Sequence, residues 1–247
     1  MDGSRTYRIG IDVGGTFTKA VLIDNAGFEV VGRYSVSTTH RDARGLAAGV
    51  VEVFRNVLER SQVDPKDVVF IAHSTTQATN ALLEGDVAAV GIIGMASRFE
   101  SVLARGQSNV KDIELAPGRF LRPSHRFITT DKLDEALVRQ TLEALRNEGA
   151  QVVVASSAFG VDDQSAEEMV MRVATQLGLA VTGGHEITKL YGLTTRTRTA
   201  VINASSLPKM IGTASMTEEA VREAGIAAPL MIMRGDGGVM DVQEMRR

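Results

Sequence analysis

The stretch that decides the fold is Ile9-Gly10-Ile11-Asp12-Val13-Gly14-Gly15-Thr16-Phe17-Thr18-Lys19-Ala20-Val21-Leu22-Ile23. Apolar residues lead into an aspartate, two glycines and two threonines, and then the apolar residues resume. This pattern predicts a strand, a tight turn and a returning strand. Because Gly14 and Gly15 lack Cβ atoms, the turn can adopt positive φ and bring backbone N–H groups close to an anion. The hydroxyls of Thr16 and Thr18 add donors, so the hairpin tip suits a phosphate.

Asp12 stands where the first of these strands is expected to end. A carboxylate there would repel a phosphate unless a divalent cation lay between them, directly or through water. We therefore predict that Asp12 is a magnesium ligand. The alternative is an ordinary hairpin with a Gly-Gly turn, which needs neither the aspartate nor the two threonines.

Composition limits the class of protein. The chain has 247 residues, 44% of them hydrophobic, which is enough for the core of one large or two smaller domains. It lacks an apolar run of roughly 18 residues and the layout of a signal peptide, which predicts a cytoplasmic protein without a membrane partner. The absence of cysteine excludes disulfides and thiolate chemistry within the chain. A net charge of −3 and the absence of tryptophan argue against a nucleic-acid partner.

The first hundred residues predict a β-β-β-α-β order. A third strand is expected over residues 28–36, and a helix over 43–60 with Asp42 as its N-cap. The apolar run 68–72 suits a buried parallel strand. His73 follows at the carboxyl end of that strand, where ligands of open α/β sheets commonly bind. Ser74 or Thr75 could cap the next helix, which carries Asn80.

The remainder predicts a second α/β unit. We expect a strand over 87–93, a short helix over 95–104 and an irregular excursion over 105–126. Helices over 133–148 and 165–177 alternate with strands over 152–155 and 179–182. Helical segments follow over 193–224, interrupted near Pro208. The predicted divisions are a first phosphate-loop unit, the excursion, a second α/β unit and a final segment, at 1–104, 105–126, 127–192 and 193–247.

The end of the chain repeats the opening pattern. An apolar strand over 229–233 leads into Arg234-Gly235-Asp236-Gly237-Gly238-Val239-Met240. This is again an aspartate with two glycines followed by an apolar return. Two such hairpins facing each other could bind a polyphosphate from both sides.

Four stretches carry a family resemblance: GIDVGGTFT at 10–18, HSTTQATNALLE at 73–84, HEITKLYGLTTRTRTAVINASSLP at 185–208 and DGGVM at 236–240. With the β-β-β-α-β order, they resemble the nucleotide-binding arrangement of actin, sugar kinases and heat-shock chaperones. Within that group the chain resembles the hydantoinase and 5-oxoprolinase family, which includes hydantoin-utilisation protein A and acetone carboxylase subunits. The resemblance implies an α/β actin-like ATPase (ribonuclease H-like) fold, cut short before its second half is complete.

The resemblance also implies an activity and a site. Such proteins use ATP and Mg²⁺ to activate the carbonyl of a cyclic amide or ketone for attack. Two loops would hold the nucleotide, with Asp12 and Asp236 binding Mg²⁺ through water, and four further residues would lie near the transferred phosphoryl group or the substrate. The loops would be Asp12, Gly14, Gly15, Thr16, Thr18 and Lys19, and Asp236, Gly237 and Gly238; the further residues would be His73, Thr75, Thr76 and Asn80.

Three features depart from the family pattern. Lys19 stands where the hydantoinase pattern usually has aspartate, and resembles instead the activator ATPases of acyl-CoA dehydratases and reductases. Ser74 replaces a glycine. The family continues beyond residue 247 through a glycine-rich segment that would contact adenosine, so we expect a C-terminal half or a partner subunit, and an oligomer.

Other interpretations remain open. The chain could be a regulatory module that binds nucleotide without turnover, or an activator ATPase, although such activators rely on cysteine-held clusters. A sugar kinase is disfavoured because no catalytic aspartate motif stands between the two phosphate loops. We interpret His185-Glu186 as a strand-end cap, and Arg196 and Arg198 as solvated helix charges, with phosphate contact as the alternative.

Overall fold

The computed structural model describes residues 5–38 and 46–245, so the predicted N-cap Asp42 and the start of its helix lie outside the described residues. The chain divides into two compact units, which we describe separately. Unit 1 comprises residues 1–80 and 209–247, and unit 2 comprises residues 81–208. The boundaries between the two units fall inside helices α2 (Thr76–Glu84) and α7 (Leu193–Glu223). They do not coincide with the boundaries of the four consecutive segments that the sequence predicts.

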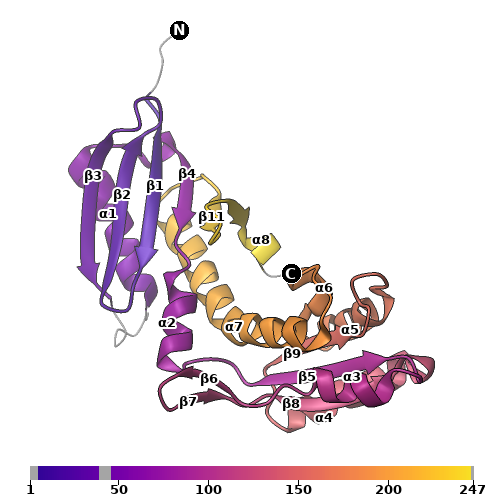
Figure 1. Ribbon diagram of the computed structural model, residues 1–247. Helices are drawn as coiled ribbons and strands as arrows, with labels where there is room; N and C mark the ends of the chain where they lie inside the picture. The colour runs from indigo at the N-terminus through magenta and orange to yellow at the C-terminus, as the bar shows by residue number, and fades with distance from the viewer. Residues whose placement is uncertain (1–4, 39–45, 246–247) are drawn as a thin grey trace. The chain divides into compact units, whose positions relative to one another are not determined.

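Unit 1 is built on a six-stranded sheet with the order β12-β11-β4-β1-β2-β3. Its strands are β1 (Tyr7–Val13), β2 (Phe17–Asp24), β3 (Val30–Ser37), β4 (Val68–His73), β11 (Leu230–Met233) and β12 (Val239–Asp241). Helix α1 (Leu46–Ser61) joins β3 to β4 and packs against β2 and β3 (Figure 1). The predicted β-β-β-α-β core is therefore confirmed.

The three central strands run in the same direction. β4 pairs in parallel with β1 on one side and with β11 on the other. In this register His73 lies beside Ile11 and beside Ile232. Because each hairpin turns where β1 or β11 ends, both hairpin tips lie at the same edge of the sheet, on either side of the end of β4. Adjacent strands are about 4.8 Å apart, so β1 and β11 are separated by roughly 10 Å.

The core of unit 1 follows from the alternation of its strands. Ile9, Ile11 and Val13 are buried on one face of β1, and Phe54 of α1 is fully buried in the same cluster. The C-terminal part of α7 completes the cluster through residues such as Val221. Asp12 lies between Ile11 and Val13 in β1, so its side chain projects from the opposite face of the sheet. Short elements complete this unit: a 3-10 turn at Pro65–Asp67 and α8 (Val242–Met245).

Unit 2 is built on a four-stranded parallel sheet with the order β10-β9-β5-β8. Its strands are β5 (Val90–Ala96), β8 (Ser124–Thr129), β9 (Val152–Ser157) and β10 (Ala180–Gly183). The helices are α3 (Ser101–Ser108), α4 (Glu135–Asn147), α5 (Ser165–Gln176), the short α6 (Gly184–Ile187) and the first part of α7. Every residue of β5 and β9 is buried, as expected for a parallel sheet covered on both faces.

Three sequence predictions for this region are wrong. The predicted helix 95–104 starts too early, because the apolar run continues as strand β5 and α3 begins only at Ser101. The excursion 105–126 is not irregular. It holds the end of α3, a hairpin of β6 (Ile113–Ala116) and β7 (Arg119–Leu121), and the start of β8. A 3-10 turn at Thr130–Lys132 follows β8. Gly118 supplies the positive φ, +73°, that this hairpin turn needs. α7 continues through Pro208, although a proline there removes a helical hydrogen bond.

Within the part of the chain that the structure describes, none of the helices is both long enough and apolar enough to cross a membrane.

Candidate functional site

The carboxyl ends of β1 and β4 bring Asp12 together with two hydroxyls. Asp12 Oδ1 accepts hydrogen bonds from Ser74 Oγ at 2.5 Å and from Thr76 Oγ1 at 2.7 Å. The Ser74 N–H donates to the Ile11 carbonyl at 2.9 Å, which continues the β1–β4 pairing past the end of the strand. Lys19 is exposed and lies directly opposite Asp12 in the hairpin register. Asp12 is therefore held by neutral donors.

This carboxylate fits a single-aspartate magnesium site. Asp12 Oδ2 has no hydrogen-bond partner among residues 5–38 and 46–245. The described residues contain no group of three or more His, Asp or Glu side chains that could enclose a metal ion. Mg²⁺ commonly uses only one or two carboxylates, with waters and substrate phosphates as its other ligands. Asp12 could therefore hold Mg²⁺ together with waters and a phosphate-bearing ligand.

The tip of the first hairpin differs in detail from the prediction. Neither Gly14 nor Gly15 is among the residues with positive φ in the described part of the chain. Gly14 is instead required by close approach: its N–H donates to the Phe17 carbonyl at 3.0 Å, and a Cβ would also lie 3.0 Å from that oxygen. Thr18 is buried, with its hydroxyl 3.4 Å from that of Thr38. Gly15 and Thr16 are the exposed residues of the tip.

The first turn of α2 is fixed to this hairpin by a residue that the sequence interpretation missed. Gln77 is buried, and its Nε2 donates to the Val13 carbonyl at 2.6 Å. Thr76 begins α2, and Asn80 lies one turn later on the same helix face. Gln77 lies inside the stretch 73–84 that carries the resemblance, which was the available signal for it.

His73 projects from the other face of the sheet. It aligns with Ile11 and Ile232, both of which face the core, and only 3% of its surface is exposed. Its Nδ1 contacts the Ser74 carbonyl, whereas Nε2 has no partner among the described residues. Burial lowers the pKa of His73 from 6.5, against smaller opposing effects of that carbonyl and of Asp12. His73 is thus a neutral imidazole at pH 7, turned away from Asp12.

The buried imidazole borders a small cavity. Its volume is about 10 Å³, and its lining includes Thr75 together with Met210, Thr213 and Ala214 of α7. Such a volume has room for about one water molecule. Of the four residues predicted near the reacting groups, Thr76 and Asn80 share the Asp12 side of the structure, whereas His73 and Thr75 line this cavity.

The second hairpin uses its aspartate internally. Asp236 Oδ1 accepts from the Gly238 N–H at 3.0 Å, and Oδ2 forms an ion pair with Arg234 Nη2 at 2.7 Å. Gly237 has φ +85° and donates its N–H to the Arg234 carbonyl at 3.0 Å. The residues from 233 to 239 are exposed. A metal-binding role for Asp236 stays a prediction, and in this structure Arg234 shares the carboxylate.

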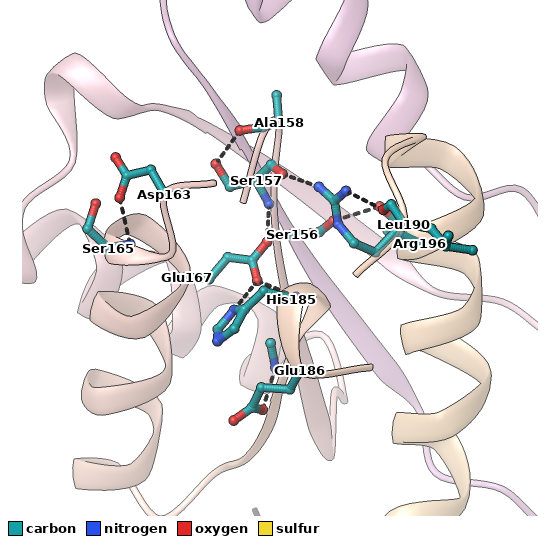
Figure 2. A network of polar contacts seen from close by, with 12 residues as sticks. Ser156, Ser157, Ala158, Asp163, Ser165, Glu167, His185, Glu186, Leu190 and Arg196 are labelled. Carbon is teal, nitrogen blue, oxygen red and sulfur yellow. Dashed lines mark hydrogen bonds and ion pairs between the residues drawn. The ribbon is translucent and has the colours of Figure 1, made fainter. Parts of the chain in front are cut away.

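A second polar arrangement lies in unit 2, at the carboxyl ends of β9 and β10 (Figure 2). Glu167 of α5 is completely buried. Its Oε1 accepts from the Ser157 N–H at 2.7 Å, and its Oε2 accepts from the His185 N–H at 2.9 Å and from His185 Nδ1 at 2.6 Å. The sequence interpretation missed Glu167, because nothing local distinguishes it from the exposed Glu168 beside it.

The ends of this network test the predictions for His185, Glu186 and the two arginines. Glu186 Oε2 accepts from the Gly183 N–H at 3.3 Å, so the strand-end cap is confirmed. Arg198 is exposed as predicted. Arg196 is not: only 2% of its surface is exposed, and its guanidinium donates to the Ser157 and Leu190 carbonyls. Its solvated interpretation was wrong because this face of α7 packs against the strand ends.

Comparison with known families gives two matches along the chain. Residues 8–178 match the model of the hydantoinase/oxoprolinase N-terminal region. Residues 196–247 match the hydantoinase/oxoprolinase model. These matches confirm the resemblance that the four sequence stretches indicated.

Two curated proteins are similar over nearly the whole chain. Caprolactamase subunit alpha of Pseudomonas jessenii is 28% identical over 97% of this chain and 37% of its own length. An uncharacterized protein of Methanocaldococcus jannaschii is 23% identical over 96% of this chain and 36% of its own length. The chain therefore spans little more than a third of the curated relatives it matches.

Two solved structures have a similar fold. The nucleotide-free structure of acetone carboxylase, an enzyme of ATP-dependent acetone carboxylation, matches with a TM-score of 0.68 and 17% identity over 98% of this chain and 38% of that one. The ATP-dependent caprolactamase from Pseudomonas jessenii matches with a TM-score of 0.65 and 25% identity, over 94% of this chain and 36% of that one. The predicted α/β fold of the actin-like ATPase type is confirmed.

Proposed function

Because the chain belongs to the hydantoinase/oxoprolinase family, we propose that it supplies the ATP-binding part of an enzyme that hydrolyses cyclic amides. Its similarity to an ATP-dependent caprolactamase supports both the use of ATP and the class of bond. That relative is named as an alpha subunit, which supports a partner subunit for this chain as well. The similarity to acetone carboxylase supports the fold alone.

The chemistry explains why ATP would be needed. Amide resonance makes a lactam carbonyl a poor electrophile. Attack of the carbonyl oxygen on the γ-phosphorus of ATP, with ADP as leaving group, would give an O-phosphorylated amide. Water could then add to the carbon, and opening of the C–N bond would release the amine and leave an acyl phosphate. A second water would hydrolyse the acyl phosphate, so that a carboxylate and an amine on one molecule are formed and inorganic phosphate is released.

The observation that carries this proposal is the common edge of the six-stranded sheet. β1 and β11 both run parallel to β4, so the two glycine-bearing hairpins turn at the same edge, about two strand spacings apart. A polyphosphate has several anionic groups to share between two such tips. The exposed Thr16 would offer its hydroxyl on one side of the polyphosphate, and the Arg234 guanidinium would offer N–H donors on the other.

Asp12 would be the magnesium ligand of this site. Ser74 and Thr76 fix Oδ1 and leave Oδ2 for the ion or for one of its waters. Bound Mg²⁺ would neutralise charge on the phosphates during transfer. Asn80 follows Thr76 on the same face of α2 and would extend this polar surface toward the substrate. Lys19, opposite Asp12, would add a cation beside the phosphates.

Titration calorimetry of Mg²⁺–ATP against the chain tests the proposal. We expect the substitution Asp12→Asn to weaken Mg²⁺-dependent binding at least about tenfold, the effect of losing one charge-assisted contact. Asp131→Asn, at an exposed aspartate of unit 2, is the matched control and should bind like the parent chain. Affinity unchanged by Asp12→Asn, or lost equally in the control, would refute the assignment.

One observation favours a second candidate, a module that binds nucleotide and does not turn it over. The histidine predicted to exchange protons, His73, is buried with a lowered pKa and is turned away from Asp12. Phosphate release from ATP, measured with and without a lactam, distinguishes the two functions. Stimulation of release by a lactam supports the hydrolase, whereas binding without release supports the module.

A further inference from the structure

Unit 2 contains a pocket that neither hairpin explains. It has a volume of about 320 Å³ and lies where β9 ends, between α3 and the start of α7. Its walls include Leu103, Phe159 and Tyr191, which are 69%, 54% and 63% exposed, and two charged residues, Glu100 and Arg196. The pocket therefore combines apolar surface with one group of each charge.

Arg196 is a buried cation with unused donors. A guanidinium has five N–H donors. Among the described residues, Arg196 uses one for the Ser157 carbonyl at 2.5 Å and one for the Leu190 carbonyl at 3.2 Å, and its Nε has no partner at all. Burying a charge without an ion-pair partner is costly. Nη1 and Nη2 each keep one further N–H, and these donors are suited to an anion that enters from the pocket.

The nearby carboxylate does not fill that role. Both oxygens of Glu167 are occupied by Ser157 and His185. Both side chains lie beside Gly184, since a Cβ at this glycine would lie 3.3 Å from Glu167 Oε1 and 3.5 Å from Arg196 Nε. Figure 2 shows the arginine reaching across from α7 to the end of β9 while the glutamate turns toward His185. Glu167 lowers the cost of the buried charge without pairing with it.

Glu100 supplies the opposite charge in the same pocket. Its Oε2 accepts from Ser97 Oγ at 2.6 Å, and Oε1 has no hydrogen-bond partner among the described residues. Glu100 also borders a neighbouring pocket of about 360 Å³, which shares Ala158 and Phe159 with the first. A simple anion at Arg196 would meet repulsion from Glu100. An ammonium group on the same ligand would turn that repulsion into attraction.

The apolar walls are held in place between these charges. Tyr191 donates its hydroxyl to Asp162 Oδ1 at 2.7 Å, which fixes the ring. Phe159 has φ +56°, a strained value for a residue other than glycine, and its carbonyl accepts the N–H groups of Asp162 and Asp163 at 2.8 and 3.1 Å. Strained backbone held by surrounding contacts is frequent at ligand sites.

We propose that this pocket binds a small amino acid as a zwitterion, with its carboxylate at Arg196, its ammonium group at Glu100 and its hydrocarbon chain along Leu103, Phe159 and Tyr191. Opening of a lactam ring yields an ω-amino acid, which is a ligand of this kind. The idea that the ligand is a product of the reaction rests on the proposed function. The binding itself requires neither ATP nor the hairpins.

Calorimetric titration with a matched set of ligands tests the pocket: 6-aminohexanoate, 4-aminobutanoate, hexanoate and hexylamine. We expect 6-aminohexanoate to bind at least about tenfold more tightly than hexanoate or hexylamine, each of which lacks one charged contact. The affinity of 4-aminobutanoate reports whether a shorter hydrocarbon chain spans the distance between Arg196 and Glu100. Glu100→Gln should weaken 6-aminohexanoate about tenfold and strengthen hexanoate, because it removes the repulsion of a simple anion. Glu143→Gln, on the exposed face of α4, should change neither.

Equal affinity for 6-aminohexanoate and hexanoate, or no binding of any of the four, overturns the proposal. So does an unchanged affinity in Glu100→Gln. Arg196→Lys is a second variant, which keeps the positive charge and removes the planar donors of the guanidinium. Circular dichroism establishes whether Arg196→Lys folds. If this variant does not fold, the result for Glu100→Gln decides whether the proposal holds. Amino-acid binding in a chain that fails to bind Mg²⁺–ATP would support the pocket and refute the proposed function, and the reverse result would do the opposite.

Discussion

Glu167 allows the most exacting stability test. Its side chain is fully buried and accepts three hydrogen bonds, from the Ser157 N–H, the His185 N–H and His185 Nδ1. Replacing it by glutamine converts one acceptor oxygen into a donor, which then faces an N–H or imidazole nitrogen. At least one hydrogen bond to a carboxylate is lost, and each such bond contributes about 1.5–3 kcal/mol.

The substitution Glu167→Leu removes both acceptor oxygens and with them all three hydrogen bonds. It leaves two backbone N–H groups and one ring nitrogen buried without partners, at about 1–3 kcal/mol each. We therefore expect Glu167→Gln to lower the free energy of unfolding by roughly 2 kcal/mol, and Glu167→Leu by more than about 3 kcal/mol. Urea unfolding followed by circular dichroism measures both values.

Glu168 provides the matched control, because it is the next residue on α5 and is exposed. Glu168→Gln should change the free energy of unfolding by less than about 0.5 kcal/mol. The reasoning is refuted if Glu167→Gln is as stable as the parent chain, or if the two glutamines have equal effects. Either result would mean that the buried network contributes no net stability to the unit.

The remaining two predictions concern a glycine and a histidine. Gly160→Ala should destabilise the chain by about 1–3 kcal/mol, because the new Cβ would lie 2.4 Å from Glu167 Oε1. Gly106→Ala, in helix α3, should stabilise the chain by roughly 0.5–1 kcal/mol, because a Cβ there meets nothing within 4 Å. The urea midpoints of the two variants check this contrast. Because the pKa of His73 is lowered in the folded chain, the unfolded chain binds a proton near pH 6 that the folded chain does not. The free energy of unfolding should therefore fall as pH drops from 7.5 through 6.5 and level off below the folded pKa. In His73→Asn this fall should be smaller; part of it should remain, because burial also lowers the pKa of His125.

Local pattern was sufficient for most of the secondary structure. The alternation in β1 and β2, the helical spacing of α1 and the apolar run of β4 are each properties of a single segment, so the β-β-β-α-β core could be predicted. The errors arose where segments compete. Met95 and Ala96 fit a helix or a strand by composition, and pairing with β8 and β9 decides for the strand.

The orientation of His73 depended on register, which the sequence does not contain. Its position at the end of a strand was predictable, but its face is set by alignment with Ile11 and Ile232, more than sixty residues before it and over a hundred and fifty after it. Arg196 is similar. Its neighbours on α7 are polar, and only the packing of that helix face against the ends of β9 and β10 buries it.

The two hairpins that look alike in sequence are electrostatically different in the folded chain. Asp12 is held by hydroxyl groups, which orient a carboxylate without neutralising it, and one of its oxygens stays available. Asp236 is paired with Arg234, so the second tip carries little net charge and retains guanidinium donors. The first tip therefore offers a carboxylate oxygen that no cation holds, whereas the carboxylate of the second tip is already paired. Within the proposed nucleotide site, Mg²⁺ would sit beside β1, and the phosphates farthest from it would be bound by the turn after β11.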